Sequence, residues 1–120
     1  MSNFFYVFIG GGLGSMARYG IADLMQGHNF TFPLATFFAN IASCFILGLF
    51  VGLSMKGYLG SNLNMFLIGG FCGGFSTFST FSNETFFLFQ SGNYGTAFAN
   101  IILSVVFCLV SIFVGIKVAG

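Results

Sequence analysis

Residues 69–83 read GGFCGGFSTFSTFSN, a stretch that sets the interpretation of the whole sequence. Four glycines come first, and a series of hydroxyl side chains ending in an amide follows directly. The stretch lies within an apolar segment of residues 65–89, which is long enough to cross a bilayer, since a helix needs about 20 residues to do so. A helix break at that depth is tolerated only where protein or a water-filled cavity satisfies the freed backbone groups. The stretch therefore predicts a membrane helix that is broken at its glycine-rich part for a functional reason.

The composition of the chain also indicates a membrane protein. Of the 120 residues, 57% are hydrophobic and 4% are charged, and the mean hydropathy is +0.99. A soluble domain carries about 25% charged residues, so the water-facing surface of such a domain cannot be built from this sequence. The net charge of +1 excludes a basic surface for nucleic acid, and no nucleic-acid partner is expected.

Four apolar segments predict four transmembrane helices in one domain, residues 1–120. They cover residues 4–24, 32–55, 65–89 and 96–118, with a polar turn at residues 26–29. Pro33 lies near the expected start of the second helix, where its missing N–H costs nothing. The expected fold class is thus an all-α membrane protein with a broken third helix. No cleavable signal is expected, because no basic region precedes the first apolar segment.

The positive charges at the two ends of the predicted helices are nearly balanced. Lys56 and Lys117 would lie on the side of both termini, and Arg18 would lie nearer the other side. This positive-inside bias is weak, so the chain could insert in both orientations. A population of mixed orientation permits an antiparallel homodimer, which is a closed two-fold assembly. Dual topology is therefore a hypothesis from the sequence.

Small residues in the apolar segments are interpreted as packing residues. Glycines four residues apart let helix backbones touch, and three such pairs occur. Residues 12–17 also fit a dinucleotide-binding pattern, but no acidic residue follows about 20 positions later, as that motif requires. The scattered cysteines are read as small core residues rather than disulfides or metal ligands. The residues are Gly10 and Gly14, Gly48 and Gly52, Gly69 and Gly73, and Cys44, Cys72 and Cys108.

Aromatic and hydroxyl side chains alternate after the glycines, each recurring every three residues. They are Phe75, Phe78 and Phe81 beside Ser76, Ser79 and Ser82. One interpretation is a packing stripe beside hydroxyls that bond to carbonyls of their own helix. The other uses the positive edge of an aromatic ring, which together with hydroxyl donors can hold a small anion without a full charge. A cationic site would bind the anion tightly and slow its exit.

Other polar residues in the predicted helices are candidates for the same path. A buried Asn more often bonds a neighbouring helix than a substrate. A charge at the bilayer centre costs about 2.5–3.5 kcal/mol on insertion scales, so Arg18 and Glu84 each need a partner, water or an interface. A wet vestibule and simple anchoring are equally good interpretations of these two charges. The uncharged candidates are Thr36 and Asn40 in the second segment, and Asn100, Ser104 and Ser111 in the fourth.

The glycine-rich segment followed by Phe-Ser-Thr-Phe, on the third of four predicted helices, resembles the signature of the CrcB/Fluc fluoride channels. Residues 10–15 with Arg18, residues 36–40, and Glu84 extend the resemblance over the chain. The resemblance implies a fluoride-selective channel, not an enzyme, that exports F⁻ passively and lowers cytoplasmic fluoride. It also implies an antiparallel dual-topology homodimer in the bacterial inner membrane, with a structural Na⁺ at the interface that is not transported.

The resemblance assigns roles to individual residues. Backbone carbonyls of Gly73 and Ser76 from both subunits would bind the sodium ion; the family commonly has Thr at position 76, a difference that leaves a carbonyl ligand intact. Phe78 and Phe81 would line the pores, and Asn40 would donate a hydrogen bond to fluoride. The remaining assignments are Ser79 and Thr80 in the polar track, Arg18 and Glu84 at the ends of the pathway, and, more weakly, Thr36, Asn100, Ser104 and Ser111.

The main alternative is a proton-coupled exporter of the small multidrug resistance type, which shares the length, the number of helices and dual topology. Such an exporter needs an ionisable carboxylate deep in the bilayer, typically a Glu in the first helix. Here the first segment has no acidic residue before Asp23, at its end. A non-transporting accessory subunit is a third class, but it leaves the hydroxyl track unexplained.

Overall fold

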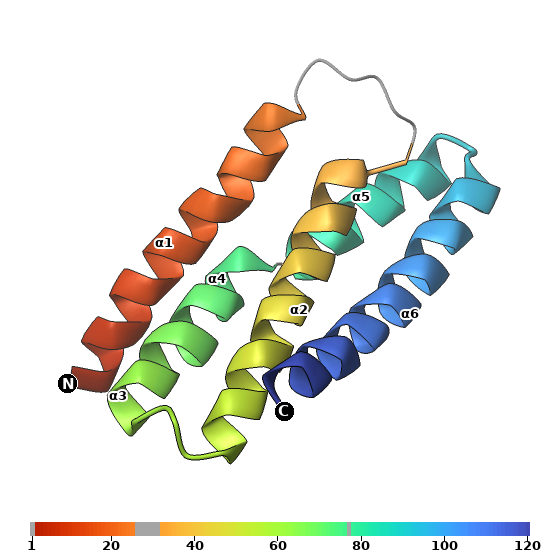
Figure 1. The fold of residues 1–120 in the computed structure, drawn as a ribbon. Coiled ribbons are helices and arrows are strands. Elements are labelled where there is room, and N and C mark those ends of the chain that lie inside the picture. The colour runs from red at the N-terminus through yellow and green to blue at the C-terminus, as the bar shows by residue number, and fades with distance from the viewer. Residues whose placement is uncertain (1, 26–31, 77) are drawn as a thin grey trace.

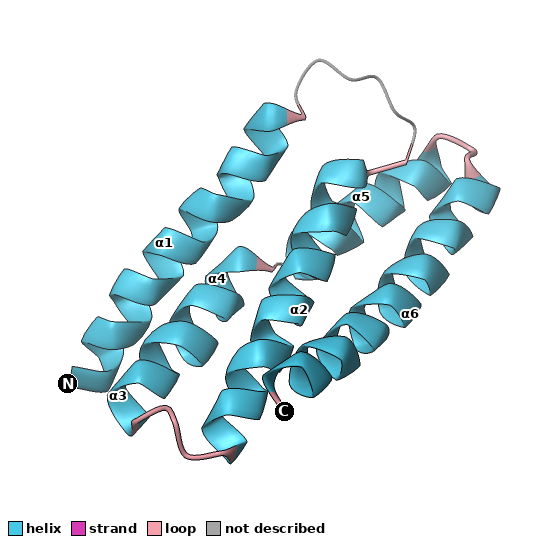
Figure 2. Ribbon diagram, viewed as in Figure 1, coloured by secondary structure: helices cyan, strands magenta, loops and turns pink. Residues whose placement is uncertain are grey.

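The computed structural model describes residues 2–25, 32–76 and 78–120, and every regular element within them is a helix. Figures 1 and 2 show these helices lying side by side in an elongated bundle, with both termini at the same end. The predicted all-α fold class is confirmed. The elements are α1 (Ser2–Leu24), α2 (Leu34–Met55), α3 (Ser61–Asn64), the π-helical η1 (Met65–Cys72), α4 (Gly73–Phe75), α5 (Phe78–Gln90) and α6 (Tyr94–Ala119).

Four helical segments correspond to the four predicted ones. α1, α2 and α6 agree with the predicted bounds to within about two residues, the usual uncertainty of helix ends. Pro33 directly precedes α2, with a φ of −77°. The third segment starts earlier than predicted, at Ser61, after extended backbone at Gly60. The predicted polar turn at residues 26–29 lies outside the described residues.

The third segment is continuous through the glycine run. α3, η1 and α4 follow one another without a gap, and we call them together the 61–75 segment. The sequence placed the break within residues 69–74, but these residues are helical. The first described departure from helical backbone is Ser76, with φ −95° and ψ 154°, and α5 begins at Phe78. Packing against α1 explains why the glycines remain helical despite their low helix propensity.

Glycines form the contact between α1 and the 61–75 segment. A Cβ atom added at Gly14 would lie 2.8 Å from the Phe75 nitrogen, and one added at Gly70 would lie 2.9 Å from the Gly10 Cα. Both distances are shorter than real Cβ contacts, so only glycine allows this approach. On the third segment Gly70 and Gly74 make the contact, not Gly69 and Gly73 as predicted. Both pairs have the same spacing, and only the rotation of the helix about its axis decides which pair faces α1.

α2 and α6 form a second close contact, as the glycine spacing predicted. A Cβ added at Gly52 would lie 2.7 Å from the Ala119 Cβ, and one added at Gly115 would lie 2.9 Å from the Leu49 nitrogen. Within the described residues, α2 and α6 are the helices that are long and apolar enough by themselves to cross a membrane, with hydropathy values of 2.1 and 2.7. They form the apolar half of the bundle.

Candidate functional site

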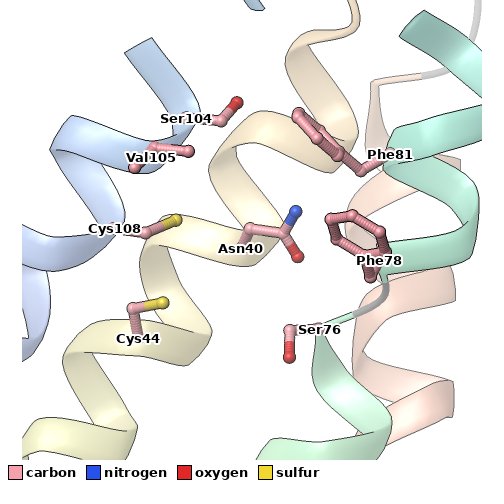
Figure 3. A pocket seen from close by; sticks show the side chains of 8 residues that line it. All are labelled: Asn40, Cys44, Ser76, Phe78, Phe81, Ser104, Val105 and Cys108. Atoms are coloured by element: carbon pink, nitrogen blue, oxygen red, sulfur yellow. The ribbon is translucent and has the colours of Figure 1, made fainter. Parts of the chain in front are cut away.

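A cavity of about 230 Å³ lies between α2, α5 and α6, beside the point where the 61–75 segment ends. Residues from the second, third and fourth predicted helices meet there, as Figure 3 shows. The structure thus brings together candidates that are far apart in the sequence. The lining residues are Asn40, Cys44, Ser76, Phe78, Phe81, Ser104, Val105 and Cys108.

Two aromatic rings form one wall of this cavity. Phe78 and Phe81 lie three residues apart on α5, a spacing that places both on one face of a helix. Their ring centroids are 5.8 Å apart and the rings are tilted by 39°. In Figure 3 the Asn40 amide group is directed toward these rings. Amide hydrogens and ring edges both carry positive partial charge, so this wall can attract an anion without a cationic side chain.

Phe75, the third ring of the predicted aromatic series, has a different role. It is buried, and its ring packs edge-on against Phe71 with a centroid distance of 5.6 Å. It lies in the 61–75 segment, against α1, rather than on the cavity wall. The three-residue recurrence does not continue across Ser76, because the backbone there is extended and reorients the following helix.

A chain of hydrogen bonds connects α6 to the backbone beside the rings. Asn100 is 1% exposed, and its Nδ2 donates to Thr85 Oγ1 at 2.9 Å. The Thr85 hydroxyl donates in turn to the Phe81 carbonyl at 2.8 Å, and the Ser104 hydroxyl donates to Asn100 Oδ1 at 3.2 Å. Asn100 thus has the helix-bonding role that is usual for a buried Asn, and the chain of bonds fixes the position of Phe81.

Carbonyl groups at the end of the 61–75 segment receive side-chain donors. The Cys72 carbonyl accepts hydrogen bonds from the hydroxyls of Ser43 and Ser76, each at 3.2 Å. Arg18 Nε donates to the Gly74 carbonyl at 3.4 Å. The last carbonyls of a helix lack partners within the helix, and a cation is favoured at that end. The partner that Arg18 needs is therefore the end of this helical segment.

Glu84 lies on α5, and its carboxylate oxygen Oε1 is buried without a hydrogen-bond partner among the described residues. Thr36 of α2 is also buried. The other candidates are placed apart from the cavity: its described lining does not include Ser79, Thr80 or Ser111. Ser79 and Thr80 nevertheless each have an interaction partner.

Sequence reasoning missed Ser43 and Thr85. Ser43 had a usable signal, because Thr36, Asn40 and Ser43 recur at i, i+4 and i+7, the spacing of one helix face. Thr85 had none, since its importance depends on the position of Asn100 on another helix.

Comparison with known proteins places the chain among its relatives. A family model described as CrcB-like protein, Camphor Resistance (CrcB), matches residues 5–116. The chain belongs to the CrcB family. Among similar CrcB-family proteins, a fluoride-specific ion channel FluC of Flavobacterium psychrophilum is 44% identical over 121 residues, covering 99% of this chain and 98% of that protein. A protein of the same name from Pyrococcus abyssi is 45% identical over 112 residues, covering 92% and 90%. Another from Azobacteroides pseudotrichonymphae is 45% identical over 108 residues, covering 88% and 86%.

Membership in the CrcB family confirms the resemblance drawn from the sequence. These relatives are named as ion channels, and the family is one of membrane channels rather than enzymes. The chain is accordingly a membrane protein, in agreement with its apolar helices α2 and α6. A location in the bacterial inner membrane is consistent with the relatives from Azobacteroides pseudotrichonymphae and Flavobacterium psychrophilum.

Proposed function

We propose that this chain forms a fluoride-selective channel that exports F⁻ passively. The observation that carries the proposal is the cavity in which the Asn40 amide faces the rings of Phe78 and Phe81. Fluoride is small, strongly hydrated and a strong hydrogen-bond acceptor, so its dehydration requires several donors at close range. An amide and ring edges supply such donors without a fixed cation that would retain the anion. Relatives named fluoride-specific ion channel FluC support the same anion.

Each cavity wall has a part in this function. Asn40 on α2 donates a hydrogen bond to the anion, and the ring edges of Phe78 and Phe81 face it from α5. Ser104 on α6 lines the same cavity, and its hydroxyl donates to Asn100 Oδ1 at 3.2 Å, which anchors this wall to the chain of hydrogen bonds. Arg18, Glu84 and Thr36 act toward the ends of the path, with Ser79, Thr80 and Ser111 as weaker candidates for its polar lining. Export needs no coupling, because the membrane potential acts with about 2.3 kcal/mol per charge per 100 mV.

The functional unit in this proposal is an antiparallel homodimer with two pores. One supporting observation is that Phe78, on the cavity wall, is 79% exposed in a single chain, so a second copy could complete the wall. The weak positive-inside bias is the other. Dual topology is tested by replacing the exposed loop residue Tyr58 with cysteine. The new thiol is then labelled from each side of the membrane with a reagent that does not cross it. Equal labelling from both sides is expected, with the parent chain as the background control; one-sided labelling would exclude dual topology.

A structural sodium ion fits the residues at the end of the 61–75 segment. Gly73 is exposed, with nothing within 4 Å of an added Cβ, so its backbone can be approached from outside the chain. Ser76 has left the helical conformation, and interrupted helices bind sodium through such carbonyls. Side chains already occupy the neighbouring carbonyls of Cys72 and Gly74. We therefore assign the sodium ligands to the carbonyls of Gly73 and Ser76 from both copies, where the ion would hold two chains together.

Fluoride efflux from liposomes containing the purified protein tests the proposed function. We expect fluoride to leave while chloride is retained, and the fluoride flux to collapse in Phe78→Ile and Phe81→Ile. Phe86→Ile is the matched control, because Phe86 lies on the same helix, is 58% exposed and does not line the cavity. Proton-coupled drug uptake without fluoride flux would instead establish the multidrug exporter.

A further inference from the structure

α2 and α6 lie side by side in a constant register. Residues of α2 meet residues of α6 that are 64 positions later, as in the 3.2 Å hydrogen bond from Lys56 Nζ to the Gly120 carbonyl. Close backbone contacts at glycines repeat this offset along the interface. The matched residues are Gly48 with Ile112, Gly52 with Ile116, and Lys56 with Gly120.

Cys44 and Cys108 continue this register one turn earlier. They lie on the two packed helices α2 and α6 at the same offset of 64 positions, and both thiols are free. Both also line the 230 Å³ cavity, and Figure 3 shows them on the wall opposite Phe78. The helix packing and the cavity therefore present two thiols as a pair beside the proposed fluoride path.

We infer that Cys44 and Cys108 form a two-thiolate site for a soft monovalent cation, Cu⁺ or its analogue Ag⁺, and that occupation of this site closes the cavity to anions. Soft thiolate ligands select such ions. No group of three or more His, Cys, Asp or Glu side chains that could hold a metal occurs within the described residues. Two thiolates are nevertheless sufficient, because Cu⁺ and Ag⁺ favour linear coordination by two sulfur atoms.

Binding converts two neutral thiols into one anionic complex. Two Cys–SH groups and one Ag⁺ give a sulfur–silver–sulfur unit of charge −1, and the two displaced protons pass to water; metal binding to thiols generally releases protons in this way. No electron is transferred. The bound unit would occupy the cavity opposite Phe78 and would repel a second anion through its charge. The closure of the channel rests on the proposed fluoride conduction, whereas the metal site itself does not.

Silver nitrate added to the purified full-length chain in chloride-free buffer tests the site, since chloride would precipitate silver. We expect one Ag⁺ per chain, the release of two protons, and thiolate-to-silver absorption in the ultraviolet. Cys44→Ser and Cys108→Ser should each lower the silver affinity by about 100-fold, as expected when one of two linked ligands is lost. Cys72→Ala is the matched control and should bind silver as the parent does, because Cys72 is buried outside the cavity lining. Alanine variants at positions 44 and 108 replace the serine ones if those do not fold.

Efflux measurements then separate the two parts of the inference. Silver should reduce fluoride efflux at least about tenfold in the parent and in Cys72→Ala, and should leave efflux unchanged in the two cavity variants, each compared with its own silver-free rate. If Cys44→Ser and Cys108→Ser bound silver as tightly as the parent, or if fewer than two protons were released, the assignment of a two-thiolate site would be overturned. If silver bound to the parent without reducing fluoride efflux, the inference that the bound ion closes the cavity to anions would be overturned. A parent that conducts no fluoride would refute the proposed function, while the proton count would still decide the site.

Discussion

A single added methyl group on α1 should have opposite effects at Gly14 and at Gly20. At Gly14 the new Cβ would lie 2.8 Å from the Phe75 nitrogen and 3.0 Å from the Phe71 carbonyl carbon. Ordinary van der Waals contacts of a Cβ lie at 3.4–4 Å, so α1 and the 61–75 segment would have to separate. At Gly20 nothing lies within 4 Å of the added atom, and the methyl group enters open space.

The expected magnitudes follow from two opposing contributions. Overpacking typically costs about 1–3 kcal/mol, whereas replacing glycine by alanine within a helix stabilises it by about 0.5–1 kcal/mol. Gly14→Ala should therefore lower the free energy of unfolding by up to about 2.5 kcal/mol, the largest difference between the two contributions. In Gly20→Ala the overpacking cost is absent, so only the gain in helix stability remains. This variant should raise the free energy of unfolding by about 0.5–1 kcal/mol.

Unfolding in mixed micelles with a rising fraction of denaturing detergent, followed by helical circular dichroism, measures both free energies. Fluoride efflux gives a second measurement, because Gly14 contacts Phe75, which directly precedes the extended residue Ser76. Efflux should fall in Gly14→Ala by more than its loss of folded protein explains. If Gly14→Ala were as stable as Gly20→Ala, the close contact between α1 and the 61–75 segment would be refuted.

Three further predictions concern polar contacts. Asn100→Ala and Thr85→Val, combined in a double-mutant cycle, should show a coupling energy of about 0.6–1.7 kcal/mol, the range for hydrogen bonds between membrane helices; additive losses would show that the bond contributes nothing. Arg18→Met should lower the free energy of unfolding by about 0.3–2 kcal/mol, because the end of the 61–75 segment loses its cation, and a stability unchanged at low salt would contradict the contact with Gly74. Replacing sodium by a large organic cation should reduce efflux and the dimer fraction in a gel-filtration assay, and indifference to sodium would remove the assignment of Gly73 as a ligand.

The sequence predicted the helices and the glycine contacts on the first two helices, Gly10 and Gly14 and Gly48 and Gly52, but not the contacting pair on the third segment. Gly69 and Gly73 have the same spacing as Gly70 and Gly74. The pair that faces α1 depends on the rotation of the 61–75 segment, to which the π-helical turns of η1 contribute by changing the residues per turn. A pattern of small residues therefore predicts that helices touch, whereas the contacting face requires the packed structure.

The sequence predicted the residues that line the cavity better than the hydrogen bonds that hold the neighbouring backbone in place. The resemblance to the CrcB/Fluc channels selected Asn40, Phe78 and Phe81, and these three residues meet in one cavity. The contact of Arg18 with the Gly74 carbonyl could not be found in the same way. Its partner is a backbone group, which becomes free only because the helix ends where it does, and the sequence placed that end earlier, within the glycine run.

The helix interruption lies in the half of the bundle that hydropathy identifies least well. α2 and α6 are apolar enough to be recognised as membrane-crossing helices by themselves, and they pack against each other through glycines. The 61–75 segment and α5 carry the glycine run and the hydroxyl series, which reduce the apolar surface available to stabilise a helix in lipid. Their stability must then come from packing and from satisfied polar groups, since each unsatisfied group in a bilayer costs several kcal/mol. Ser43 and Ser76 on the Cys72 carbonyl and Arg18 on the Gly74 carbonyl provide such satisfaction at the end of the 61–75 segment, so these side chains stabilise the interruption in a membrane.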